Sequence, residues 1–104
     1  MNATATEYTV DYFIAKFKAI PEEKWCVEAY KDDSGRCCAL GHCMAEDTPE
    51  VEASFESIYG LFTRIFAGPT TVNDGRDPRY PQPTPKQRIL AALRDIKAKQ
   101  EAAR

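Results

Sequence analysis

Apolar residues recur at intervals of three and four in three separate segments of the chain. This spacing constrains the fold most, because it is the period of an α-helix with one buried face. The first segment runs from Val10 to Ile20, the second from Val51 to Ile65 and the third from Ile89 to Ile96. The sequence therefore predicts a mainly α protein with three main helices around one apolar core.

Residues that start and stop helices flank two of these segments. Thr9 stands before the first segment as an N-cap, and Pro21 ends it because proline removes a backbone donor and clashes with the preceding turn. Thr84 and Gln87 form a capping box before the last segment. The chain after Lys97 is polar, and we expect this end of the last helix to fray.

Residues that can start and stop a helix also flank the middle segment. Residues 48–49, a threonine followed by a proline, predict its start, and residues 68–69, a glycine followed by a proline, predict its end. Gly60 weakens the helix by roughly 1 kcal/mol relative to alanine, so we expect another group to approach closely there. The predicted core stripe comprises Val51, Phe55, Ile58, Phe62 and Ile65, widened by Leu61 and Phe66.

Between the first two segments the pattern changes to alternation. Residues 25–30 alternate apolar and polar side chains, residues 32–35 supply turn formers, and residues 36–38 can return as a second strand. Residues 39–45 then predict a short helix. We therefore expect one short helix and a small two-stranded hairpin beside the three main helices, with α+β as the alternative fold class.

Length and composition favour one soluble domain. The 104 residues match the size of a single domain, and 43% hydrophobic and 29% charged residues are ordinary for a folded protein. We expect a single domain over residues 1–104, frayed at 1–8 and 100–104. The start of the chain has neither a basic flank nor an apolar run, so we expect no signal peptide, no membrane contact and a cytoplasmic location, with the four cysteines as thiols.

Charge is divided unevenly along the chain. Residues 1–63 hold five Lys and Arg against twelve Asp and Glu, whereas residues 64–104 hold nine against four. The basic part includes a stretch from residue 69 to residue 83 that reads as one irregular loop, which is long for a domain of this size. Loops of this length usually have a function.

The loop leads into the N-terminus of the last helix, where free backbone amides favour an anion. Arg76 and Arg79 could grip a phosphate, and Tyr80 could stack on a base. The alternative is a turn-rich loop whose charges face water. The predicted ligand-binding residues are Asn73, Asp74, Arg76, Arg79, Tyr80, Gln82, Lys86, Arg88 and His42.

A second constellation suggests zinc. Cys38 and His42 are four residues apart, and Cys26 with Cys37 or Cys43 could complete a tetrahedron. The chain lacks a Cys-x-x-Cys pair, and Cys43 lies about 100° around the helix from His42. We therefore favour buried cysteines that pack in the core, and predict neither a metal nor a cofactor.

Two further functions are weaker alternatives. Cys38 with His42 as its base would be a nucleophile, but the sequence shows no orienting carboxylate and no oxyanion hole, so we predict no catalytic residue. The basic last helix could contact nucleic acid, but an overall pI near 5.4 argues against a dedicated nucleic-acid domain.

Several segments together resemble a group of small uncharacterised proteins encoded by bacteria and their phages. They are residues 8–14, 20–25, 38–43 (CALGHC), 73–75 (NDG) and 82–93, which include TPKQRILAAL. The resemblance covers most of the chain except the middle helix. It implies a phage or mobile-element origin and the cytosol of a bacterial host, and it brings no activity or site residues.

These observations lead to one hypothesis with two alternatives. The sequence predicts a non-enzymatic accessory protein that binds a small anionic ligand, of which a nucleotide-derived molecule is one candidate, for example to sequester a host defence signal. The first alternative is an interaction module that docks on a host protein. The second is the zinc-binding or Cys/His-dependent enzyme. The oligomeric state stays open, and a second subunit could complete a site in so small a protein.

Overall fold

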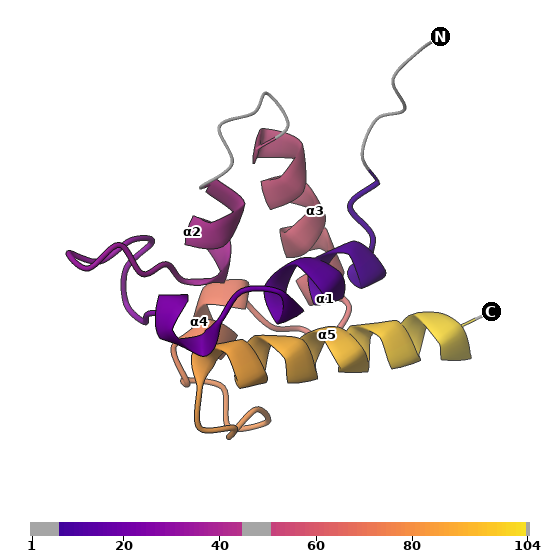
Figure 1. Ribbon diagram of the computed structural model, residues 1–104. Helices are drawn as coiled ribbons and strands as arrows, with labels where there is room; N and C mark the ends of the chain where they lie inside the picture. The colour runs from indigo at the N-terminus through magenta and orange to yellow at the C-terminus, as the bar shows by residue number, and fades with distance from the viewer. Residues whose placement is uncertain (1–6, 45–50, 104) are drawn as a thin grey trace, which may run out of the picture.

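The computed structural model describes residues 7–44 and 51–103, and the protein is mainly helical, as predicted (Figure 1). Among these residues no helix combines the length and the hydropathy needed to cross a bilayer. The helices are α1 (Val10–Lys18), a 3₁₀ turn (Glu22–Lys24), α2 (Ala39–Met44), α3 (Val51–Thr63), α4 (Pro69–Asn73) and α5 (Pro85–Ala102).

The long helix α5 organises the core. In Figure 1 it runs along one side of the molecule, with α1 and α4 packed against it and α2 and α3 beyond them. Burying one large apolar side chain stabilises the fold by roughly 1.5–3 kcal/mol. The largest fully buried apolar side chains are Phe13, Phe17, Leu40, Ile58, Phe62, Ile65, Val72, Ile89, Leu93 and Ile96.

Both predicted N-caps are confirmed. The Thr9 side chain accepts a hydrogen bond from the backbone N–H of Tyr12 at 3.1 Å, and the Thr84 side chain accepts one from Gln87 at 3.2 Å. The last helix continues beyond Lys97, where we expected fraying, and ends at Ala102.

The predicted hairpin is not confirmed: the described residues hold two isolated bridges there instead of paired strands. Cys37 bridges Trp25 in parallel and Lys31 in antiparallel fashion. The Cys37 N–H donates to the Lys24 carbonyl and the Cys37 carbonyl accepts from the Cys26 N–H, whereas the neighbouring Arg36 carbonyl accepts from the Asp32 N–H on the other side. Glu28 also adopts a left-handed conformation, with φ of +65°, which interrupts an extended strand in the middle.

The predicted end of the middle helix is wrong. Helix α3 ends at Thr63, and Phe66 follows in a left-handed conformation with φ of +53°. The Phe66 N–H bonds to the Thr63 carbonyl and the Ala67 N–H to the Phe62 carbonyl, at 3.1 and 3.2 Å. This is a Schellman motif, with phenylalanine where glycine is usual. Phe66 is 92% exposed and does not belong to the core stripe.

The glycine and proline that we expected to stop the middle helix instead start another. Gly68 is the N-cap of α4 and Pro69 its first residue, so the first third of the predicted irregular loop is helical. The predicted start of the middle helix at residues 48–49, and the predicted last residue of the short helix, Ala45, lie outside the described residues.

Candidate functional site

Arg79, predicted to grip a phosphate, closes the end of α3 instead. Its guanidinium donates to the Ile65 carbonyl at 2.6 Å and to the Phe66 carbonyl at 3.3 Å. It also makes two hydrogen bonds to the Asp77 carboxylate, at 3.0 and 2.8 Å. The Arg79 guanidinium lowers the pKa of Asp77, which keeps this pair charged. The carbonyls of the turn that follows α3 thus obtain donors that the helix itself cannot supply.

Arg88 does the same for α4. Its side chain donates to the carbonyls of Val72 at 3.2 Å and Asn73 at 2.7 Å, and to that of Gln82 at 2.9 Å. Burial lowers the pKa of Arg88. Gly75, with φ of +77°, lets the chain pass beside this guanidinium, since a Cβ there would lie 3.3 Å from Arg88 Cζ.

Lys86 stabilises the C-terminal end of α1, because its Nζ donates to the Lys18 carbonyl at 3.0 Å. Three of the predicted ligand-binding cations therefore stabilise C-terminal helix ends, where positive charge is favourable. For Arg79 and Arg88 the sequence gives one signal of this helix-end role, because neither α3 nor α4 has a basic residue in its own last turn.

Tyr80 is buried and does not offer its ring to a ligand. Its hydroxyl donates to an Asp95 carboxylate oxygen at 2.8 Å, and burial, reinforced by Asp95, raises the pKa of Tyr80 to about 12. Gln82 is half-buried, and its Oε1 finds no hydrogen-bond partner among the described residues.

Asn73 is fully buried and joins three segments. Its Oδ1 accepts from the Ala39 N–H, and its Nδ2 donates to the Cys26 carbonyl and to Asp74 Oδ1, each at 3.0 Å. Asn73 thereby fixes the loop of residues 26–38 to the start of α2 and the end of α4. Its role is to position the site next to it.

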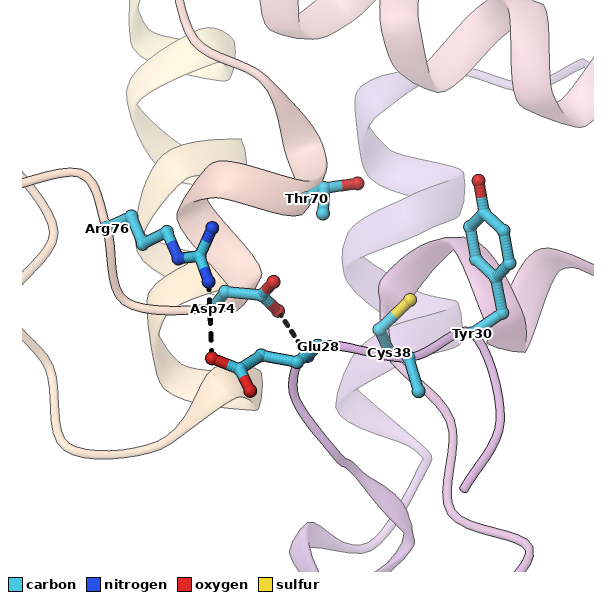
Figure 2. Close-up of a pocket in the computed structure, with 7 residues that line it drawn as sticks. Glu28, Tyr30, Cys38, Thr70, Asp74 and Arg76 are labelled. Atoms are coloured by element: carbon cyan, nitrogen blue, oxygen red, sulfur yellow. Dashed lines mark hydrogen bonds and ion pairs between the residues drawn. The ribbon is translucent and has the colours of Figure 1, made fainter. Parts of the chain in front are cut away.

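That site is a hollow of about 480 Å³ between this loop and the segment formed by α4 and the residues that follow it. Figure 2 shows side chains from both segments around it. Its volume is within the range of small-molecule pockets. The lining residues are Glu28, Ala29, Tyr30, Cys38, Thr70, Asp74 and Arg76.

Glu28 and Arg76 form an ion pair at the mouth of this pocket, with Arg76 Nη2 and Glu28 Oε1 3.2 Å apart. About two thirds of each side chain is exposed, at 66% for Arg76 and 68% for Glu28. The left-handed backbone of Glu28 is held by its N–H, which donates to Asp74 Oδ1 at 3.0 Å (Figure 2). Among the described residues, the other Asp74 oxygen, Oδ2, has no hydrogen-bond partner.

The cysteines and His42 lie in the core. Burial raises the pKa of Cys26 and Cys38, so both thiols stay protonated, and Cys26 Sγ donates to backbone carbonyls. His42 packs its ring 4.7 Å from that of Trp25, and burial lowers its pKa. Cys43 is buried. No group of three or more His, Cys, Asp or Glu within residues 7–44 and 51–103 is placed to hold a metal ion.

Neither a family model, nor a curated protein, nor a solved structure matches the chain.

Of the predicted ligand-binding residues, only Asp74 and Arg76 line the pocket. The sequence analysis missed Glu28, Tyr30 and Thr70 as lining residues. No local signal identifies them, because the loop of residues 26–38 reaches α4 through contacts between residues more than thirty positions apart.

Proposed function

We propose that the protein is a non-enzymatic binding protein for a small anion that also carries N–H donors, most simply a nucleotide-derived molecule, and that the ligand occupies the pocket of Glu28 and Arg76. One observation carries the proposal. Of the four predicted loop and helix cations, Arg76 alone directs its guanidinium at an exposed carboxylate over a pocket rather than at helix-end carbonyls.

Arg76 supplies the anion-binding group. Its ion pair with Glu28 is exposed, and such pairs contribute only about 0–1 kcal/mol. A phosphate can therefore take over the guanidinium at low cost, because Arg binds phosphate through two parallel hydrogen bonds.

The carboxylates supply the second half of recognition. Once Glu28 leaves Arg76, its oxygens and Asp74 Oδ2 can accept hydrogen bonds from neighbouring N–H groups of a base such as guanine. Tyr30, which is 53% exposed and lines the pocket, offers a ring for stacking. Two carboxylates against one guanidinium disfavour a bare phosphate, so the ligand needs both features.

The surroundings support binding rather than covalent chemistry. Cys38 lines the pocket, but burial raises the pKa of its thiol, which disfavours the nucleophilic thiolate. The resemblance of several segments to phage-encoded proteins supports a role in which the protein sequesters a signal molecule of a bacterial host.

The first experiment is native mass spectrometry of protein purified from bacterial cells without dialysis. We expect a bound species of nucleotide mass in the wild type and its loss in Arg76→Ala. Arg94→Ala is the matched control, because it removes an exposed arginine of α5 away from the pocket. Calorimetry with guanosine monophosphate, guanosine and inorganic phosphate then separates the contributions of base and phosphate.

Loss of a charge-assisted hydrogen bond is worth about 1.5–3 kcal/mol, so Arg76→Ala should weaken nucleotide binding about 10- to 100-fold. Binding that survives unchanged in Arg76→Ala would place the ligand elsewhere. A bare polypeptide mass together with no binding of guanosine or adenosine monophosphate would refute the proposal.

A further inference from the structure

The outer face of α3 is open to solvent along its whole length. Figure 1 shows α3 rising from α5 beside α2, and its buried side faces these helices and α4. The exposed residues of the described helix are Glu52, Ala53, Glu56, Tyr59, Gly60 and Thr63. We call this surface, together with Arg64 and Phe66, the α3 face.

Gly60 lies at the centre of the α3 face and has no intramolecular reason to be glycine. Gly60 lies inside α3, and glycine stabilises a helix less than alanine does. A Cβ at this position would have no neighbour within 4 Å, and Gly60 does not have a positive φ. The close approach that the sequence predicts at Gly60 is therefore not made by any described part of the same chain.

Two aromatic side chains border this glycine without being covered. Tyr59 is 45% exposed and Phe66 is 92% exposed. Phe66 also holds a left-handed backbone that is costly for a bulky residue, and Arg79 fixes this backbone by its bond to the Phe66 carbonyl. Strained residues of this kind persist where they serve a function.

Two opposite charges of the α3 face, Glu56 on the helix and Arg64 just after its end, are equally spaced from Gly60 in the sequence, whereas Glu52 has no basic counterpart. Glu56 stands four residues before Gly60 and Arg64 four residues after it. Neither makes an ion pair with another described residue.

We propose that the α3 face binds the α3 face of a second copy of this chain, with the two helices antiparallel about a two-fold axis at Gly60. In this arrangement Gly60 lies against Gly60, which lets the helices approach closely. Glu56 of each copy lies opposite Arg64 of the other, so two ion pairs form. Phe66 of each copy then lies at the level of residues 53–54 in the other, and covers apolar surface that water covers in the monomer.

The charge pattern is the reason for choosing a second copy. A two-fold axis requires one surface to be complementary to itself, so that residue i meets j and j meets i. Glu56 and Arg64 satisfy this requirement because they are equally spaced from Gly60 and opposite in charge. An unrelated partner would not require this symmetry.

Sedimentation equilibrium over a range of concentrations tests the dimer. We expect Glu56→Arg and Arg64→Glu to weaken self-association about tenfold or more, because each places like charges opposite one another twice. An equimolar mixture of the two variants restores opposite charges at both positions. The mixture should therefore associate as tightly as the wild type, although each variant alone does not.

Gly60→Ala separates the helix from the interface. It should raise the melting temperature of the monomer, because alanine favours the helix and finds open space, yet weaken the dimer. A wild type that stays monomeric at millimolar concentration would overturn the proposal. So would a dimer that the charge variants leave unchanged, or a mixture that associates no better than its components.

Discussion

Glu28 and Phe66 are the two described residues other than glycine that adopt a positive φ, and the molecule treats them differently. The Glu28 backbone N–H and carboxylate are both bonded, to Asp74 and Arg76, and the residue lies at a pocket. The Phe66 ring is almost fully exposed, with only its backbone bonded. Strain at Glu28 shapes a concave site, whereas strain at Phe66 displays a side chain.

One short segment, residues 73–79, contacts both the Glu28 region and the Phe66 region. Asn73, Asp74 and Arg76 contact the loop of residues 26–38, while Asp77 and Arg79 contact the end of α3. This polar segment is therefore a structural connector, and two of its side chains, Asp74 and Arg76, line the pocket.

The largest expected effect is on the Glu28 side, where Asn73→Ala removes three hydrogen bonds. Two buried backbone groups, the Ala39 N–H and the Cys26 carbonyl, then lack partners, which should lower the free energy of unfolding by about 3 kcal/mol. Urea unfolding followed by circular dichroism measures this. Thr71→Ala, an exposed position on the same helix, is the control, and a loss no larger than in that control would contradict the role of Asn73.

On the Phe66 side, Arg79→Ala should lower stability by about 1–2 kcal/mol, because the carbonyls of the turn after α3 lose their donor. Hydrogen exchange at the amides of residues 65–67 should become faster, while ligand binding at the Glu28 pocket should stay unchanged. If Arg79→Ala instead abolished binding and left stability intact, the comparison would be wrong and the loop would be the ligand site.

Acid should first destabilise the region around His42, whose ring packs against Trp25. Burial holds the pKa of His42 below its ordinary value of 6.5, so on acidification the unfolded chain takes up the proton before the folded one does. The part of the unfolding free energy that depends on neutral His42 is therefore fully present above pH 6.5. It decreases as the pH falls below 6.5, by at most about 1.4 kcal/mol per pH unit. Unfolding followed by Trp25 fluorescence should show this slope, and His42→Asn, which does not titrate, should flatten it.

The smallest expected changes in stability come from placing glycine at each of the two left-handed positions. These two substitutions compare the two regions most directly. Phe66→Gly should raise stability by about 0.5–1 kcal/mol, because it relieves the backbone and loses no buried contact. Glu28→Gly should change stability by close to 0 kcal/mol, since the same relief is offset by loss of the ion pair with Arg76. Equal changes in the two variants, measured by urea unfolding, would show that the two places do not differ.

The helices could be predicted from the sequence because their signals are local. Thr9 and Thr84 cap the nearest amides, and the apolar faces of α1 and α5 follow from spacing alone. The short helix α4 was missed because Gly68 and Pro69 can end one helix or begin the next. Only the turn at Phe66, which no propensity favours, decides between these.

The candidate site was harder to predict, because a cation has the same sequence signature whether it binds a ligand or a backbone carbonyl. Arg79, Lys86 and Arg88 find carbonyls at helix ends, and only the fold brings these within reach. Tyr80 and Tyr30 are equally plausible rings by sequence, yet burial removes the first and leaves the second at the pocket.

The packing of α1 against α5 also determines when the chain can fold. These two helices share the most extensive contact in the molecule, yet about 70 residues separate them. A ribosome adding about 5–20 residues per second needs roughly 4–14 s to make that stretch. Throughout this interval the apolar face of α1 lacks α5, its main helical partner, and only nearby residues such as Trp25 are present to pack against Phe17. A ribosome that stalls before residue 85 would leave that face without α5.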